Sequence, residues 1–138
     1  MKAKIDPAFL LEQARGAMSG AYAPYSSFCV GAALLTSDGQ VVTGANVENA
    51  SYGLAMCAER VAIGTAVAAG KHHFIAIAIA ANEASPCTPC GACRQVMAEF
   101  APDVDVILES ADGSPWVLGL QELLPHQFAF DALASRKG

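Results

Sequence analysis

The sequence is short of charge, and its few basic residues are scattered. Charged residues make up 15% of the 138 residues, against about 25% in an ordinary soluble domain. The eight Lys and Arg form no stripe or cluster, and the formal net charge is −5. A polyanionic partner usually requires a basic footprint on the protein. The sequence therefore predicts that nucleic acid is not the substrate.

Long apolar runs and a leader pattern are also missing. The longest unbroken apolar stretch runs from Phe74 to Ala81, far short of the roughly 20 residues that span a bilayer. No basic segment precedes an apolar one at the N-terminus, which predicts a cytoplasmic protein without a signal peptide. Hydrophobic residues nevertheless make up 54% of the chain. We expect this apolar excess to be buried in a single domain, residues 1–138, and at a subunit interface.

The cysteines are a poor basis for disulfides, because their number is odd and three of them fall within seven residues. In a reducing compartment, clustered cysteines favour metal binding or catalysis. The five are Cys29, Cys57, Cys87, Cys90 and Cys93. The three histidines, His72, His73 and His126, follow helix-ending residues and are not expected to bind the metal.

The chain begins with the signs of an amphipathic helix. Asp6 followed by Pro7 is typical of a helix start, because the carboxylate caps free N–H groups and proline fits the first helical position. Gly20 is expected to end this helix. Its predicted apolar face consists of Phe9, Leu10, Ala14, Ala17 and Met18.

Downstream, segments typical of buried strands alternate with segments rich in helix formers. The expected strands are 28–36, 40–45, 74–81, 105–110 and 116–118, and the expected helices are 57–69, 90–100 and 119–124. The turn Ser37-Asp38-Gly39 makes the first two strands a hairpin. Helices that alternate with buried strands predict an α/β sheet covered on both faces. The pattern does not give the direction of the last strand.

Two of the predicted helices begin with cysteines. Cys57-Ala58-Glu59 opens one, and Pro89-Cys90-Gly91-Ala92-Cys93 opens another. A helix N-terminus lowers the pKa of a thiol, and the thiolate is the form that binds metal. Three thiolates on one zinc ion leave its fourth tetrahedral position to water, which is typical of a catalytic site. Water bound in this way ionises near neutral pH.

Each motif alone has a plainer interpretation. A lone Cys-x-x-Cys is more often a redox pair or half of a structural zinc site, and a Glu two residues after a Cys is usually a solvated helix residue. The combination is more specific, because Cys-x-Glu, 29 further residues and Pro-Cys-x-x-Cys match the zinc-deaminase signature with three cysteine ligands. Cys87 creates a second, overlapping Pro-Cys-x-x-Cys that begins at Pro86. Cys87 and Cys90 are therefore an alternative pair of ligands.

With these motifs, the chain resembles the small homotetrameric zinc-dependent cytidine deaminases over nearly its whole length. The matching stretches are Tyr25-Ser26-Ser27-Phe28, Val30-Gly31-Ala32-Ala33-Leu34, Asn46-Val47-Glu48-Asn49-Ala50-Ser51-Tyr52-Gly53, Cys57-Ala58-Glu59-Arg60, Cys90-Gly91-Ala92-Cys93-Arg94-Gln95, and Glu122-Leu123-Leu124-Pro125 with Phe128. The resemblance implies a three-layer α/β fold, with a central mixed sheet of about five strands flanked by helices. It also implies one Zn²⁺ per chain and hydrolysis of cytidine or 2′-deoxycytidine to uridine or deoxyuridine and ammonia, as in pyrimidine salvage.

The resemblance also assigns a role to each matching residue. Cys57, Cys90 and Cys93 would hold zinc. Glu59 would shuttle protons, and Arg60 would hydrogen-bond the zinc thiolates. The residues implied in substrate binding are Phe28 against the pyrimidine, Asn46 and Glu48 at the ribose hydroxyls, backbone groups of Ala58 and Cys90 at the ring edge, Tyr52, and Phe128 over the pocket of a neighbouring subunit. Cys87 and Cys29 are expected to take no part.

Two other classes of protein share parts of this pattern. A deaminase of another aminopyrimidine, such as blasticidin S, would share the zinc motif, but Asn46 and Glu48 argue for a ribose. A non-catalytic zinc module would not need Glu59 and would normally supply four protein ligands. In plainer interpretations, Arg60 is a surface helix residue and Phe128 is a core residue of its own subunit.

Overall fold

A single mixed sheet of five strands, in the order β2-β1-β3-β4-β5, forms the centre of the molecule. The computed structural model describes residues 4–83 and 85–128. The strands are β1 (Val30–Thr36), β2 (Val41–Ala45), β3 (Phe74–Ala81), β4 (Asp105–Glu109) and β5 (Pro115–Gly119). Strand β1 is antiparallel to both β2 and β3, β3 is parallel to β4, and β5 is antiparallel to β4. The expected mixed sheet is confirmed, and its last strand is an antiparallel edge strand.

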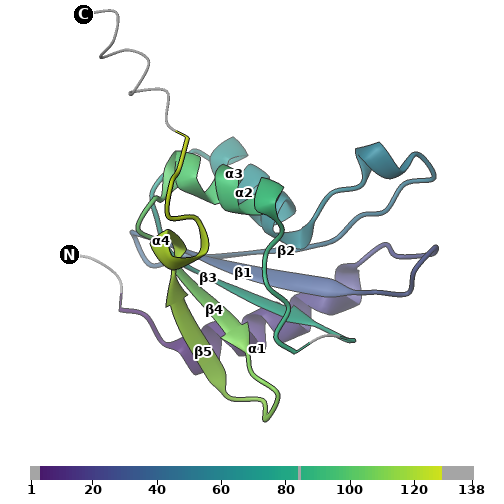
Figure 1. Cartoon of the computed structure of the whole chain (residues 1–138), viewed down its shortest axis with the longest axis horizontal. Helices are drawn as coiled ribbons and strands as arrows, with labels where there is room; N and C mark the ends of the chain where they lie inside the picture. Colours follow the sequence, from purple (N-terminus) through teal and green to yellow (C-terminus); the bar gives the residue numbers. More distant parts are fainter. Residues whose placement is uncertain (1–3, 84, 129–138) are drawn as a thin grey trace, which may run out of the picture.

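Helices cover both faces of the sheet (Figure 1). One face packs against α1 (Pro7–Ala17), and the other packs against α2 (Ala58–Ala68) and α3 (Gly91–Phe100). Short helical turns are η1 (Met18–Gly20), η2 (Tyr52–Leu54) and α4 (Leu120–Leu123). The predicted three-layer arrangement is therefore confirmed. Within the described part of the chain, no helix has both the length and the apolar character needed to cross a membrane.

The central strand β3 has two different faces. Ile77 and Ile79 pack into the core beneath α2 and α3, whereas the alternating alanines, such as Ala78, pack into the core beneath α1. The small alanine side chains let α1 lie close to the sheet. A Cβ atom on Gly31 of β1 would fall 1.9 Å from the backbone oxygen of Ala14, so this approach requires a glycine.

The first helix begins as predicted, but its apolar face differs. The Asp6 carboxylate accepts a hydrogen bond from the N–H of Phe9 at 3.2 Å, and proline occupies the first helical position. Of the predicted face, Leu10 and Ala14 are buried, whereas the Phe9 side chain is 48% exposed. Leu11, which the prediction left out, is buried instead. The buried stripe faces the alanine side of the sheet, and Phe9 lies on its flank.

The α-helical part of the first helix ends at Ala17, and the three residues to the predicted end at Gly20 form η1. A second boundary difference falls at the start of β1. The predicted strand began at Phe28, whereas β1 begins at Val30. Phe28 and Cys29 lie in a loop in which both N–H groups and the Phe28 carbonyl bond to side chains, and the Cys29 carbonyl accepts from the backbone N–H of Asn82, just beyond β3. The other strands and α2 to α4 begin and end within one residue of their predicted bounds.

Candidate active site

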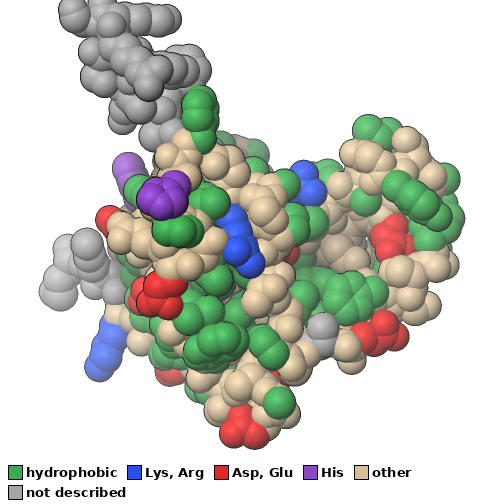
Figure 2. All heavy atoms as spheres, viewed as in Figure 1, with side chains coloured by type: hydrophobic (Ala, Val, Ile, Leu, Met, Phe, Trp, Pro, Cys, Tyr) green, Lys and Arg blue, Asp and Glu red, His purple; other side chains and the backbone are tan. Residues whose placement is uncertain are grey.

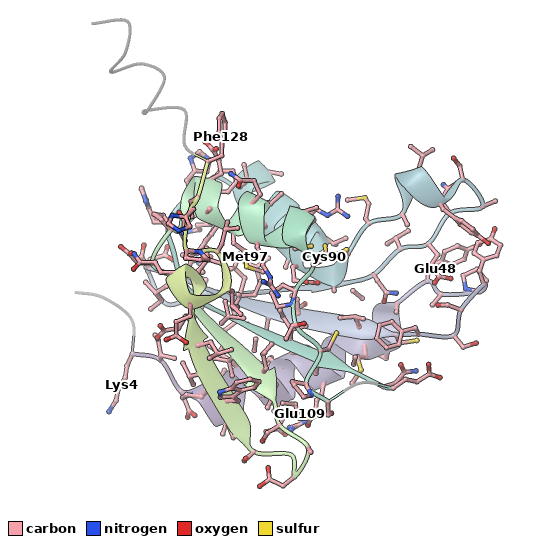
Figure 3. All side chains as sticks on the ribbon, in the orientation of Figure 1. Lys4, Glu48, Cys90, Met97, Glu109 and Phe128 are labelled. Atoms are coloured by element: carbon pink, nitrogen blue, oxygen red, sulfur yellow. The ribbon has the colours of Figure 1, made fainter. Side chains whose placement is uncertain are left out.

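Three cysteines meet where α2 and α3 begin. Cys57 and Cys90 are the N-cap residues of these two helices, and Cys93 lies in the first turn of α3. Their sulfur atoms all lie within 4.8 Å of one another, with 3.9 Å between those of Cys57 and Cys90. Figure 3 shows Cys90 at this end of α3, beside other sulfur atoms. The two helix starts therefore bring the three predicted ligands together.

Cys87 lies outside this group. Among the described residues, the potential metal-binding cluster consists of Cys57, Cys90 and Cys93, without a histidine. Cys87 is half-buried in the loop that precedes α3. The geometry thus favours the ligand set with Cys93 over the overlapping alternative.

The environment of the three cysteines suits a zinc ion. Three thiolates are ligands that zinc prefers, and they leave one tetrahedral position open. The N–H of Cys93 donates to the Sγ of Cys90 at 3.5 Å. Nη2 of Arg60 donates to the Sγ of Cys57 at 3.4 Å, as the resemblance implied for this arginine. Both contacts, together with the two helix N-termini, favour sulfur in its charged form.

The thiols of the cluster differ in acidity. The pKa of Cys57 is lowered to about 5, first because the Cys93 thiol donates a hydrogen bond to it and further because Arg60 does. The pKa of Cys93 is raised, because its thiol is the donor in this pair and is desolvated. The first thiolate therefore forms at Cys57, beside the guanidinium. A divalent cation at the centre of the cluster would favour ionisation of all three.

Glu59 places a carboxyl group beside the cluster. It belongs to the first turn of α2, and its side chain is 5% exposed. Burial raises the pKa of this carboxyl above its ordinary value, and the negative charge of Cys57 raises it further. A carboxyl whose pKa is raised toward neutrality can both take up and release protons during turnover.

A cavity of about 400 Å³ opens beside the cysteines and Glu59. Its walls come from the loop before β1, the segment between β2 and α2, the start of α2 and the loop before α3. Figure 2 shows this hollow between the projecting segment that contains η2 and the helices. Such a volume is typical of a small-molecule site. The predicted site residues that line it are Phe28, Asn46, Glu48, Tyr52, Cys57, Ala58, Glu59, Arg60 and Cys90.

Phe128 is a predicted site residue that the structure does not bring to this cavity. Its side chain is 63% exposed, and Figure 3 shows it directed outward, away from Cys90. Its carbonyl oxygen accepts a hydrogen bond from Nε2 of Gln95 on α3 at 3.0 Å. This exposure does not fit a core residue of its own subunit. Tyr52, by contrast, lines the cavity although its side chain is 81% exposed.

Two residues that were expected to bind the substrate also hold the loop that carries Phe28. Asn46 accepts from the N–H of Val30 at 2.9 Å and donates to the carbonyl oxygen of Phe28 at 2.8 Å. Glu48 accepts from two backbone N–H groups of the loop at 2.9 and 3.3 Å. The Ser26 hydroxyl, and then these N–H groups, hold the pKa of Glu48 below its ordinary value. Sequence reasoning missed this second role, because no spacing pattern signals contacts between loops.

The fold and the site define a class of protein. A three-layer α/β domain in which one helix begins with Cys-x-Glu and the next with Cys-x-x-Cys is that of a zinc-dependent deaminase. The family model described as "Cytidine and deoxycytidylate deaminase zinc-binding region" matches residues 5–109. The chain belongs to this family. The family and the cysteine cluster together confirm the predicted zinc cofactor.

Individual members of the family are similar over most of this chain. The cytidine deaminase of Halalkalibacterium halodurans is 50% identical over 125 residues, which cover 90% of this chain and 95% of that protein. The cytidine deaminase of Mycobacterium tuberculosis (strain H37Rv) is 43% identical over 129 residues, which cover 94% of each protein. The crystal structure of cytidine deaminase from Burkholderia pseudomallei matches with a TM-score of 0.84 and 50% identity, covering 90% of this chain and 100% of that chain. The three-layer fold is therefore shared with a solved relative.

Proposed function

We propose that this chain catalyses the hydrolytic deamination of cytidine and 2′-deoxycytidine to uridine and deoxyuridine, with release of ammonia. The observation that carries this proposal is a buried Glu59 carboxyl beside three clustered thiols, at the wall of a cavity of about 400 Å³. Relatives that are named cytidine deaminase, at up to 50% identity over 90% of the chain, support the substrate class.

Cys57, Cys90 and Cys93 would hold one zinc ion per chain. When bound, the zinc supplies Lewis-acid activation of a water molecule. Three thiolates leave the site with a net negative charge, which weakens such activation. Arg60 offsets this charge through its hydrogen bond to the Cys57 sulfur.

Glu59 moves the protons of the reaction. Its carboxylate accepts a proton from water as the water oxygen bonds to C4 of the pyrimidine, and it delivers this proton to N3. It then accepts the remaining proton of the new hydroxyl and passes it to the amino group. The C4–N bond breaks, ammonia leaves, and a carbonyl remains at C4. Burial, which raises the pKa of Glu59, suits the carboxyl to both halves of this exchange.

Other groups that line the cavity recognise the nucleoside. The Phe28 ring packs against the pyrimidine, and backbone groups of Ala58 and Cys90 bond to its edge. Asn46 and Glu48 bond to the ribose hydroxyls. Each can do so while it keeps its contacts with the loop, since it has more hydrogen-bonding positions than these contacts occupy. The Glu48 carboxylate would repel a phosphate nearby, which favours nucleosides over nucleotides. Tyr52 lies at the exposed rim.

Measurement of ammonia release by the zinc-loaded protein tests the proposal. Cytidine, 2′-deoxycytidine and blasticidin S are offered separately, with Glu59→Gln as the matched inactive variant. Turnover of the two nucleosides by the natural sequence, with no turnover by Glu59→Gln, supports the proposal. Turnover of blasticidin S alone would assign the chain to another aminopyrimidine, and zinc binding without any turnover would indicate a non-catalytic module.

We also propose a homotetramer in which Phe128 closes the cavity of a neighbouring subunit. Gln95 ties the Phe128 backbone to α3 while the ring stays 63% exposed. Aromatic side chains are enriched where subunits meet, and an exposed ring can be buried there. Further exposed large apolar side chains include Phe9, Leu54, Met56, Trp116 and Val117.

Mixed oligomers test the shared site. Glu59→Ala lacks the proton shuttle, whereas Phe128→Ala keeps the shuttle but lacks the ring. In a mixed tetramer, a Phe128→Ala subunit can receive an intact ring from a Glu59→Ala neighbour. Activity per chain should then exceed the average of the two parents. Confirmed hetero-oligomers that never exceed this average would place the whole cavity within one subunit.

A further inference from the structure

We infer that Asn82 positions the Phe28 side chain, and the catalytic consequence of this role rests on the proposed function. Asn82 directly follows β3 and lies outside the set of residues that line the cavity. Its Nδ2 donates to the carbonyl oxygen of Ser27 at 2.9 Å, and its Oδ1 accepts from the N–H of Cys29 at 3.0 Å. Its own N–H donates to the carbonyl oxygen of Cys29 at 3.0 Å. One residue therefore holds the chain on both sides of Phe28.

The loop needs such support because of the conformation of Ser27. Its φ of 60° lies in the left-handed region, which is unfavourable for a residue with a Cβ atom. A residue in this region keeps its conformation when the surroundings fix it. The Asn82 side chain hydrogen-bonds both the carbonyl oxygen of Ser27 and the N–H of Cys29. Because these two groups are fixed, Ser27 cannot easily return to an ordinary φ.

Two other side chains hydrogen-bond the backbone of Phe28 directly. One belongs to the same loop, and the other also belongs to the proposed substrate site. The Phe28 N–H donates to the Ser26 hydroxyl at 3.0 Å, and the Phe28 carbonyl accepts from Asn46 at 2.8 Å. Asn46 lines the cavity, whereas Asn82 does not. Substitution of Asn82 therefore changes the support of Phe28 without removing a group that faces the substrate.

The consequence concerns binding and not chemistry. The Phe28 ring packs against the core beneath α2 and lines the cavity. Glu59 and the three cysteines belong to the starts of α2 and α3, which the Asn82 side chain does not hydrogen-bond. Loss of the Asn82 side chain should let the ring move while the proton shuttle and the metal ligands stay in place.

Asn82→Ala, Asn82→Asp and a control variant test this assignment in the full-length zinc-loaded protein. Asp112→Ala is the control, because Asp112 also accepts a backbone N–H at 3.0 Å, in the turn between β4 and β5. For Asn82→Ala we expect the KM for cytidine to rise about tenfold with kcat within about twofold, as two hydrogen bonds to a strained turn are lost. Zinc content should not change.

Hydrogen exchange measures the same contact without substrate. In Asn82→Ala, the amide of Cys29 should exchange about tenfold faster, because its acceptor is gone. Asn82→Asp keeps an acceptor for this amide but loses the donor to Ser27. Its exchange at Cys29 should stay near that of the natural sequence, and its KM should be intermediate. Asp112→Ala should change neither quantity.

Three results would overturn the inference or separate it from the proposed function. Unchanged Cys29 exchange in Asn82→Ala would show that Asn82 does not hold the loop. Faster exchange with a fall in kcat at unchanged KM, or with loss of zinc, would show that the effect spreads through the fold and does not act through Phe28. If the natural sequence releases no ammonia from cytidine, the proposed function fails, and the exchange result still decides whether Asn82 holds the loop.

Discussion

The cavity has two walls that are fixed in different ways. The metal wall (Cys57, Glu59 and Cys90, with Cys93 behind it) belongs to the N-caps and first turns of two helices that pack on the sheet. The loop wall (residues 24–28 and 46–56) projects beyond the sheet (Figure 1). It is held by side-chain hydrogen bonds of Asn46 and Glu48 and by scattered backbone hydrogen bonds, such as the pair between Val47 and Met56. Glu59 in the first wall is 5% exposed, whereas Tyr52 in the second is 81% exposed. The groups proposed for chemistry thus lie at the starts of packed helices, whereas the side chains proposed for nucleoside recognition lie on loops.

Removal of a ligand from the metal wall should have the largest effect. Cys90→Ala or Cys93→Ala leaves two thiolates, too few for a stable zinc site, so both zinc and activity should be lost, the latter by more than about 10³-fold. Cys87→Ala is the matched control and should keep both within about twofold. Metal analysis and ammonia release measure the two quantities. A metal-free Cys87→Ala protein together with a zinc-containing Cys93→Ala protein would move the ligand to Cys87.

Glu59→Gln should separate chemistry from metal within the same wall. Glutamine keeps the shape of the side chain but cannot carry the proton. Turnover should therefore fall by about 10³-fold while zinc stays near one per chain. Metal analysis and ammonia release again measure the two quantities. Substantial loss of zinc with a modest loss of activity would make Glu59 a structural residue and would contradict the proposed mechanism.

Glu48→Gln should weaken the loop wall and leave the metal wall intact. The carboxylate accepts from the Ser26 hydroxyl and from two loop N–H groups, and an amide accepts more weakly than a carboxylate. We expect the KM for cytidine to rise by about tenfold, with zinc content unchanged and kcat within about threefold. Steady-state kinetics measure KM and kcat separately. Equal losses in kcat and kcat/KM would show that Glu48 acts on the chemical step.

The smallest effect is expected away from both walls, at the exposed Asp38–Lys71 ion pair of 2.6 Å. The hydrogen bond from Lys71, and then that from Thr36, lowers the pKa of Asp38 from 3.8 to about 2. Because the folded pKa lies below the unfolded one, the pair stabilises the fold above about pH 4, and this contribution is lost as the pH falls through about 2. Asp38→Asn should therefore lower Tm slightly at pH 7 and by less at pH 2, with normal activity at pH 7. Equal Tm values at pH 7 would contradict this prediction.

The same contrast explains how much of the molecule could be predicted from its sequence. Strand β3 and the helix starts at Cys57 and Cys90 follow from local patterns, namely an apolar run and capping positions beside helix formers. The conformation of Phe28 depends on a partner, Asn82, that is more than fifty residues away in the sequence. No local pattern carries this information. The apolar character of Phe28 therefore predicted a strand where the structure has a loop.

Because the cysteines belong to two different helices, a metal ion bound by them also reduces the conformational entropy of the unfolded chain. Cys57 and Cys90 are 33 residues apart in the sequence, and α2 and β3 lie between them. An ion held by both restricts the conformations open to this segment much as a disulfide would, and closure of such a loop stabilises a fold by about 3 to 4 kcal/mol in chain-entropy terms. Removal of the ion by a chelator should therefore lower the stability of the fold as well as abolish the activity. An ion bound by Cys57, Cys90 and Cys93 would also limit how far α2 and α3 can separate when the fold begins to open.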